Sequence, residues 1–290
     1  MRPWIEFVQM QRLPVEHGRP GVSAAAIDYR VLSSDELEGS ASLLLHLSTG
    51  EHFPDFEAER DVEVFVTWGA LDVADQANRL HAFSYRFMPA GGERPVMSAA
   101  RPSTVLVFTG PLLDANACAM ASERDVQPVD VVNKPWQATV TPGLTPGAAR
   151  KDLRNDPLTG EQTWVLGTLP MRFGSRSEWH PVVEEMVLLS GVLNSPLGDM
   201  HPGAYFWRPP GEEHGPFGSR SGTVMLFRTV GGPLETTFSG EERDMNTIAR
   251  ADQIVPDDVR QSLDMAWRPA EDPWVLLASE RSAVTEGARG

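Results

Sequence analysis

The chain has 290 residues and a formal net charge of −15, which argues against binding to nucleic acid or an anionic membrane, since both require clustered Lys and Arg. No apolar run is long enough to span a bilayer, and residues 1–6 lack the apolar segment of a signal peptide. The single cysteine, Cys118, cannot form an internal disulfide, so we expect a cytoplasmic protein.

Short apolar runs separated by Gly and Pro predict β-strands along the chain, among them residues 62–68, 105–108, 186–189 and 224–227. No long apolar stretch with a period of 3.6 residues lies between them, which disfavours an α/β fold. We expect helices only as short pieces, for example at residues 257–267. The pattern therefore predicts an all-β protein, and the length is sufficient for two domains that each bury a core.

An internal repeat relates the two halves. Residues 30–39 align with residues 151–160 through a basic residue, Leu, Asp, Leu and Gly at matching positions. Further along, residues 105–108 align with residues 224–227. Between these blocks the aligned pairs are Glu63 and Glu185, Gly69 and Gly191, His81 and His201, Tyr85 and Tyr205, Pro89 and Pro209, and Gly91 and Gly211.

The repeat predicts a domain division. A Pro-rich segment at residues 122–146 separates the copies, so we expect an N-terminal domain at residues 1–125 and a C-terminal domain at residues 126–240. Residues 241–290 no longer match the repeat. We expect this acidic extension to dock on a domain or a partner and to end in disorder.

The second copy contains the candidate site. In an extended strand, Glu178, His180 and Glu184 would project from one face, and His214 could meet them from a neighbouring strand. Two imidazoles and a carboxylate with open positions suit one divalent transition metal. We therefore expect a metal at His180, Glu184 and His214. Glu178 is either a further ligand or the general base that moves a proton in catalysis.

Two further residues, Glu185 and His201, could serve as ligands instead of, or in addition to, those named above. Glu185 competes with Glu184, but strand parity places Glu184 on the face of His180. His201 is a possible ligand, although its counterpart in the first copy, His81, favours a structural role.

The first copy lacks the ligands. It has Phe56, Ala58, Val62 and Arg94 at the positions aligned with Glu178, His180, Glu184 and His214. None of these is an ordinary metal ligand, so we expect the N-terminal domain to be free of metal. A shifted site at His52 and Glu63 is the weaker alternative, because no third ligand accompanies them.

The two motifs resemble those of the cupin superfamily. The first is His180-x3-Glu184-x6-Gly191, and the second is Gly203-x5-Pro209-x-Gly211-x2-His214. The chain departs from the pattern at Glu178, where many cupins have a histidine. Residues 179–185, 205–211 and 214–216 are also similar to the cupin part of the anti-sigma factor that senses singlet oxygen. The resemblance implies two tandem double-stranded β-helix (cupin or jelly-roll) barrels, a bicupin, and a homodimer.

Two classes of function are open. In the first, Fe(II), or alternatively Mn or Ni, binds a small oxygen-rich substrate and O2, as in a dioxygenase; a redox-neutral isomerase or lyase with Zn or Mn would use the same ligands. In the second, Zn serves a sensor that binds a small molecule or a protein. A closed Zn site usually recruits thiolate, and Cys118 lies in the other half of the chain, so the enzyme is favoured.

Aromatic side chains surround the two motifs. We expect Tyr205, Trp207 and Trp164 to line the substrate pocket, where they would favour a planar or apolar substrate.

Overall fold

The computed structural model describes residues 2–22, 25–74, 79–139 and 141–242. Among these, a first compact unit comprises Arg2 and residues 13–134, and a second comprises residues 3–12 and 135–242. No helix within the described ranges has the length and apolarity of a membrane span. The helix expected at 257–267 and nearly all of the C-terminal extension lie outside the described residues.

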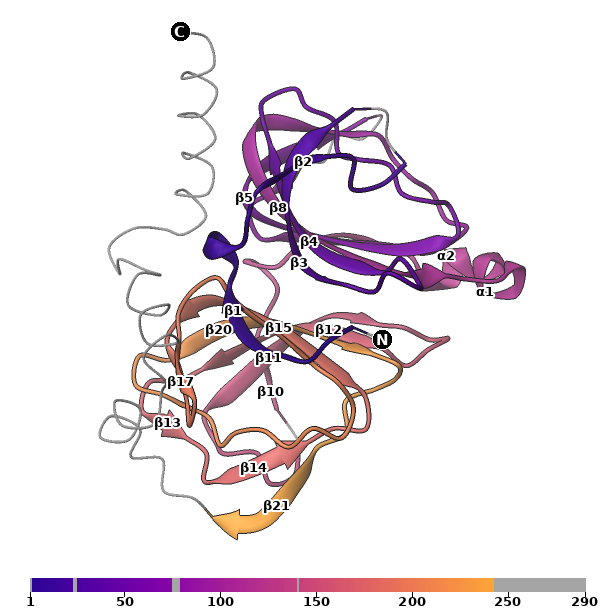
Figure 1. The fold of residues 1–290 in the computed structure, drawn as a ribbon. Helices are drawn as coiled ribbons and strands as arrows, with labels where there is room; N and C mark the ends of the chain where they lie inside the picture. The colour runs from indigo at the N-terminus through magenta and orange to yellow at the C-terminus, as the bar shows by residue number, and fades with distance from the viewer. Residues whose placement is uncertain (1, 23–24, 75–78, 140, 243–290) are drawn as a thin grey trace, which may run out of the picture. The chain divides into compact units, whose positions relative to one another are not determined.

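The first unit is built on an eight-stranded antiparallel sheet (Figure 1). Its elements are β2 (Glu16–Gly18), β3 (Ile27–Ser34), β4 (Ala41–Leu47), β5 (Arg60–Val73), β6 (Leu80–His81), β7 (Ser84–Met88), β8 (Met97–Leu112), α1 (Ala115–Ala119), α2 (Ala121–Arg124) and β9 (Val126–Asp130). The main path runs β2-β3-β4-β8-β5-β7-β9, with β6 paired to β5.

The second unit contains a seven-stranded, a four-stranded and a two-stranded sheet. Its elements are β1 (Ile5–Gln9), η1 (Met10–Arg12), β10 (Gln137–Ala138), β11 (Ala148–Asn155), β12 (Gln162–Thr168), β13 (Arg172–Phe173), β14 (Arg176–Trp179), β15 (Val183–Gly191), β16 (Leu193–Ser195), β17 (Gly198–Met200), β18 (Ala204–Arg208), β19 (Gly218–Ser219), β20 (Thr223–Val230) and β21 (Thr237–Glu242). The predicted apolar strands lie within β5, β8, β15 and β20, so the predominance of β-structure is confirmed.

The large sheets of the two units share one strand order. The first reads β3-β4-β8-β5-β7 and the second reads β11-β12-β20-β15-β18, which are the strands that the sequence repeat aligns. The turns agree as well. The Asp35 carboxylate accepts the backbone N–H groups of the second and third residues after it, and Asp156 does the same in the second unit.

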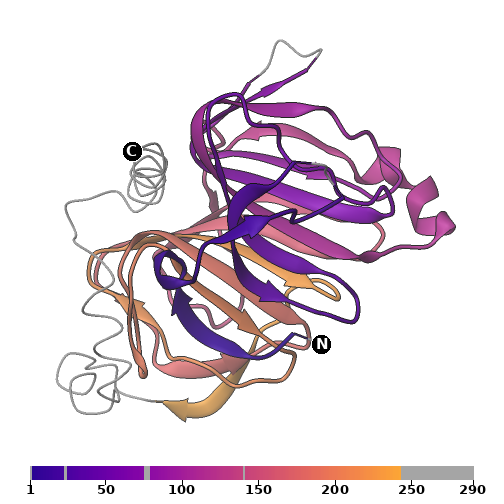
Figure 2. The same cartoon turned by 45° about the horizontal axis from the view of Figure 1, so that its top comes forward.

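The outermost strands also correspond, although they come from different parts of the chain. β9 pairs with β7 so that Val129 faces Tyr85, whereas β1 pairs with β18 so that Val8 faces Tyr205. Tyr85 and Tyr205 are aligned in the repeat, so β1 takes in the second unit the place that β9 takes in the first. Figures 1 and 2 show β1, in indigo, among the strands of the second unit. The expected division at residue 125 falls just before β9, whereas the compact units divide after Lys134.

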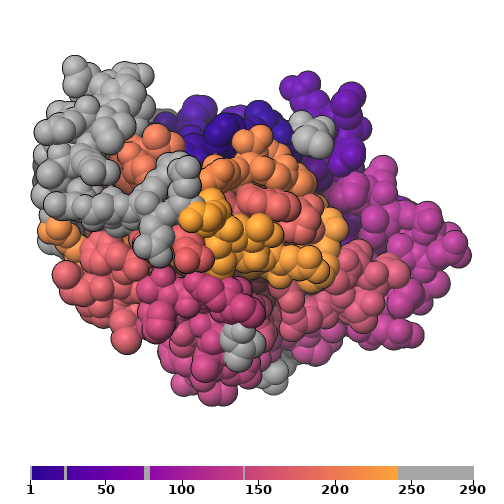
Figure 3. Space-filling model, turned by 90° about the horizontal axis from the view of Figure 1, so that it is seen from below, coloured from indigo at the N-terminus to yellow at the C-terminus, as the bar shows by residue number. Residues whose placement is uncertain are grey.

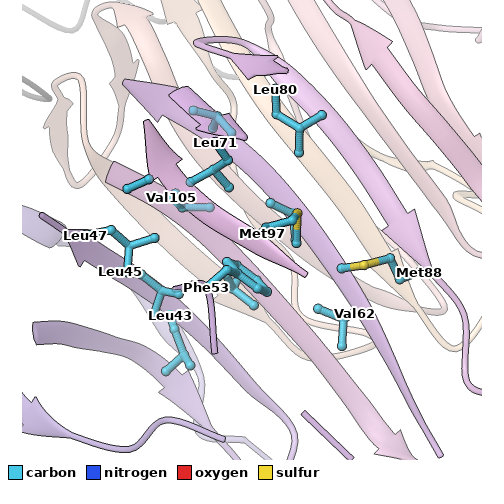
Figure 4. Close-up of a cluster of buried hydrophobic side chains, with 14 of the residues drawn as sticks. Leu43, Leu45, Leu47, Phe53, Val62, Leu71, Leu80, Met88, Met97 and Val105 are labelled. Carbon is cyan, nitrogen blue, oxygen red and sulfur yellow. The ribbon is translucent and has the colours of Figure 1, made fainter. Parts of the chain in front are cut away.

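An apolar cluster fills the first unit between β4, β5, β7 and β8 (Figure 4). Phe56 and Val62, which the repeat aligns with Glu178 and Glu184, both belong to this cluster and are buried. Arg94, aligned with His214, donates a hydrogen bond to the carbonyl oxygen of Arg60. The first unit therefore has the apolar side chains of Phe56 and Val62 at the positions where the second unit has the carboxylates of Glu178 and Glu184.

The second unit differs because its long strands are interrupted. β15 ends at Gly191, whose φ of +82° is rarely adopted by residues with a side chain, and the next strand, β16, joins the four-stranded sheet. A Cβ atom at Gly191 would lie 1.9 Å from the carbonyl oxygen of Gly222, so the close approach also requires glycine. In the first unit, β5 continues unbroken past the aligned Gly69.

Candidate metal centre

The two sequence motifs meet where β14 ends and β15 begins. β14 pairs with β21, which lies at the surface of the second unit (Figure 3), whereas β15 pairs with β18 and β20 in the large sheet. The expectation of one extended strand from Glu178 to Glu184 is therefore wrong. Pro181 lies between the two strands and has no N–H to donate to a ladder, which accounts for the break.

The side chains converge despite this break. Glu178 and His214 form an isolated antiparallel bridge in which each backbone N–H donates to the other's carbonyl, at 2.8 and 2.9 Å. Directly opposed residues of such a pair have neighbouring side chains. Ligand atoms of Glu178, His180 and His214 all lie within 4.8 Å of one another.

Both histidines present a bare nitrogen to the site. His180 Nδ1 lies 3.0 Å from the carbonyl oxygen of Glu235, and His214 Nδ1 lies 2.8 Å from that of Glu212. A carbonyl only accepts, so each Nδ1 carries a proton, and in the neutral imidazole the lone pair then lies on Nε2. Both Nε2 atoms are buried and have no hydrogen-bond partner among the described residues. This is the arrangement of metal-binding histidines oriented by the backbone.

Glu184 lies between the two imidazoles. Its Oε1 is 3.6 Å from His180 Nε2 and its Oε2 is 3.4 Å from His214 Nε2. Two ligands at about 2.1 Å from one tetrahedral ion are about 3.4 Å apart. Each imidazole Nε2 thus lies near that separation from a different oxygen of Glu184, whereas the carboxylate that shares the cluster of mutually close ligand atoms with both imidazoles is that of Glu178.

An arginine fixes the Glu184 carboxylate. Arg208 Nη1 lies 3.3 Å from Glu184 Oε2, and Arg208 Nη2 lies 3.2 Å from Glu6 Oε1 on β1. The guanidinium also packs 3.6 Å from the centre of the Phe206 ring and 4.9 Å from that of Phe217. The sequence patterns did not indicate a role for Arg208 or Glu6. One signal was available for Arg208: the repeat aligns it with Met88, so the first copy lacks the arginine together with the ligands.

Burial and neighbouring charges shift three pKa values in the metal-free protein. Burial, together with the charge of Glu184, raises the pKa of Glu178 to about 7. Burial lowers the pKa of His214 to about 4, although Glu184 opposes this shift. Burial also opposes ionisation of Glu184, but His180, His214 and Arg208 outweigh it, so the Glu184 pKa is lowered. At neutral pH the site thus contains ionised Glu184 beside a neutral His214.

Glu185 belongs to the opposite face of β15. Its carboxylate accepts the Tyr205 hydroxyl at 2.7 Å and pairs with Arg228 at 2.6 Å. The first unit repeats this contact, because the hydroxyl of Tyr85 donates to Glu63 at 2.7 Å. Glu184 therefore stays the candidate ligand because it lies beside both imidazoles, not because of strand parity, which the break after Trp179 interrupts; Glu185 makes structural contacts.

A cavity of about 80 Å³ adjoins the site and includes Glu178 and Glu184 in its lining. Its lining does not include Tyr205, Trp207 or Trp164, which we expected around the substrate. β18 presents Phe206 and Arg208 to the cavity, and the side chains of Tyr205 and Trp207, which alternate with them, point away.

The two remaining predicted residues lie apart from the ligand atoms. Trp164 packs deeper in the core, stacked on Phe227 with ring centres 5.3 Å apart. His201, in the turn before β18, is not part of the ligand cluster found among the described residues.

The family and structure comparisons agree with this architecture. A family model described as "Domain of unknown function (DUF4437)" matches residues 7–235. No curated protein matches the sequence.

Three solved structures show the fold. A proposed dioxygenase from Nostoc punctiforme is 19% identical, with a TM-score of 0.67 over 84% of this chain and 85% of that one. A cupin 2 conserved barrel domain protein from Leptotrichia buccalis is 10% identical, with a TM-score of 0.51 over 79% and 97%. An oxalate decarboxylase from Bacillus subtilis is 10% identical, with a TM-score of 0.53 over 93% and 88%. The chain shares the cupin fold with these proteins, and at such identities the likeness does not extend to a reaction.

Proposed function

The chain belongs to the DUF4437 family, and we propose that it is a metal-dependent cupin enzyme that acts on a small oxygen-rich molecule, using Fe(II) as an oxygenase or dioxygenase. His180, Glu184 and His214 would hold the ion. The two buried, unpartnered Nε2 atoms on either side of the Glu184 carboxylate carry this proposal, because an unsatisfied buried nitrogen is costly unless a cation or proton donor completes it.

The ion and the surrounding side chains would have separate roles in catalysis. An iron ion, when bound, would supply Lewis acidity and one-electron chemistry. Arg208 holds the Glu184 carboxylate in place, and the apolar lining of the cavity limits the access of water. Glu178 is positioned to accept or donate a proton at its carboxylate, since its pKa of about 7 allows both states near neutral pH.

A non-catalytic Zn-binding protein, which would sense a small molecule or another protein, is the second candidate. The observation in its favour is that Glu178 forms the ligand cluster with His180 and His214 while Glu184 lies between the two imidazoles, so two carboxylates and two imidazoles could close a tetrahedral shell. A redox-neutral isomerase or lyase with Zn or Mn is the remaining enzymatic alternative. The enzyme is preferred because a cavity reaches the site.

We further propose a bicupin, with two tandem barrels of which the first is free of metal. The equal strand order of the two large sheets supports this, and so does the apolar core where the first unit lacks the ligands. The homodimer and the cytoplasmic location follow from the resemblance and from the composition. The closer similarity to the cupin part of the singlet-oxygen-sensing anti-sigma factor stays a prediction.

Metal analysis of purified protein tests the ligand set. We expect about one metal ion per chain, lost in His180→Ala, His214→Ala and Glu184→Gln, because a metal site fails when a ligand is removed. His201→Ala and Glu185→Gln are the matched controls, and both should retain the ion. Full metal content in the His180 and His214 variants would dismiss the proposed ligands.

Oxygen consumption tests the reaction class. The Fe(II)-loaded protein would be screened against diketones, catechols and hydroxy acids, with the metal-free His214→Ala variant as the control. Substrate-dependent O2 uptake by the loaded wild type alone would support the oxygenase. Substrate turnover without O2 uptake would favour the isomerase or lyase, and binding without turnover would favour the sensor.

A further inference from the structure

The cavity beside the metal centre contains an arginine that the ligand set does not use. Arg172, on β13, lines the cavity together with Glu178 and Glu184. Its Nε and Nη2 atoms donate to the carbonyl oxygen of Thr145 at 3.1 and 2.8 Å, which fixes the plane of the guanidinium. A guanidinium has five N–H donors, so the two bonds to Thr145 leave donors for a ligand, and the carboxylate whose charge acts on this guanidinium is that of Glu178.

The charge of Glu178 acts on Arg172, and a divalent ion bound at the centre would compete with Arg172 for that carboxylate. Arg208 and the ion carry three positive charges, which Glu184, Glu178 and Glu6 match. Arg172 is then one cation in excess, and burial already lowers its pKa. A partly buried charge in excess is costly, so the site favours a ligand with a single negative charge.

The lining and volume of the cavity restrict the size and polarity of the rest of that ligand. Phe206, Phe217 and Phe227 line it with further Leu and Met side chains. The volume of about 80 Å³ is small beside the roughly 300–1,000 Å³ of ordinary ligand pockets. A molecule that fits has a small apolar body beside its oxygen-bearing group.

We propose that the substrate of this centre is a small monocarboxylate, whose carboxylate group Arg172 binds while its apolar part lies against the phenylalanine rings. This inference rests on the proposed metal site and adds the substrate class to it. Arginine suits the role better than lysine, because its planar fork matches the two oxygens of a carboxylate.

Calorimetric titration of the metal-loaded protein tests the proposal, with propionate as the probe and propionamide as its neutral isostere. Metal content is measured first in every sample. We expect propionate to bind at least about tenfold more tightly than propionamide, since a desolvated charge-assisted pair is worth more than about 1.4 kcal/mol. Arg172→Gln should remove this preference while it leaves propionamide binding within about twofold, and Arg172→Lys should retain part of it.

Arg220→Gln is the matched control, because Arg220 is an exposed arginine of the same unit. It should bind propionate like the wild type. Equal binding of the two probes by the metal-loaded wild type would overturn the carboxylate assignment and leave the metal centre standing, and so would undiminished propionate binding by a folded Arg172→Gln. A wild type that binds no metal would overturn both proposals. The wild-type comparison decides the matter even if Arg172→Gln does not fold.

Discussion

At the scale of single residues, protonation is what distinguishes the site from an ordinary buried polar cluster. Glu178 has a pKa raised to about 7, so it is mostly protonated at pH 6 in the metal-free protein. His214 has a pKa of about 4 and is already neutral there, and Glu184 is already ionised. Of these three groups, only Glu178 has a proton to lose when a cation enters.

We therefore predict that metal binding releases a proton from Glu178. A nearby cation favours the carboxylate, so the wild type should release about 0.9 more protons per ion than Glu178→Gln at pH 6, and only about 0.1 more at pH 8. Calorimetric titrations in buffers of different ionisation enthalpy measure this number. An equal proton count in the two proteins at pH 6 would contradict the prediction. If Glu178→Gln also binds metal much more weakly, Glu178 is a ligand as well as a proton carrier.

The spacing of residues indicated the candidate ligands but not the charged side chains beside them. His180, Glu184 and His214 stand in two ordered motifs, whereas Arg172 and Arg208 have no motif of their own. The direction of β18 could not be read from sequence because alternation gives two faces without saying which is inward. Once Glu184 is known to point inward, its pairing with Arg208 places Arg208 on the same face and Tyr205 on the other.

At the scale of elements, β1 connects the N-terminus to the candidate site. It covers the edge of β18, and its Glu6 holds the Arg208 guanidinium that in turn holds Glu184. The sequence did not predict this, because pairing between residues so far apart leaves no local pattern. The strands themselves could be predicted from local sequence, since apolar runs such as residues 62–68 and 224–227 lie within β5 and β20.

We predict that Glu6→Gln weakens metal binding although Glu6 is not a ligand. Without its charge Arg208 is less constrained, and the Glu184 carboxylate is held less firmly, so the affinity should fall by roughly the 10–100-fold typical of residues that orient a ligand. Chelator competition measures the affinity. Glu36→Gln, an exposed glutamate of the first unit, should bind metal like the wild type. Unchanged affinity in Glu6→Gln would show that β1 does not position the centre.

At the scale of the whole molecule, two units of one strand order differ in what fills them. The repeat in the sequence predicted the common order, and the missing ligands predicted the difference. Sequence could not predict that β15 stops at Gly191 while β5 runs on, because Gly69 also has a positive φ, of +89°. The same backbone conformation is compatible with a continued strand in one unit and a new sheet in the other.

This difference predicts that metal stabilises the protein through the second unit alone. A ligand that binds only the folded state adds about 4 kcal/mol to the free energy of unfolding at a free concentration 1,000 times its Kd. The Tm should therefore rise by several degrees on metal addition and fall again with chelator. His214→Ala should abolish the shift, whereas Arg94→Ala, changed at the aligned position of the first unit, should retain it. Thermal unfolding with and without metal measures both shifts, and an equal rise in His214→Ala would place the stabilising ion elsewhere than at the convergence of His180, Glu184 and His214.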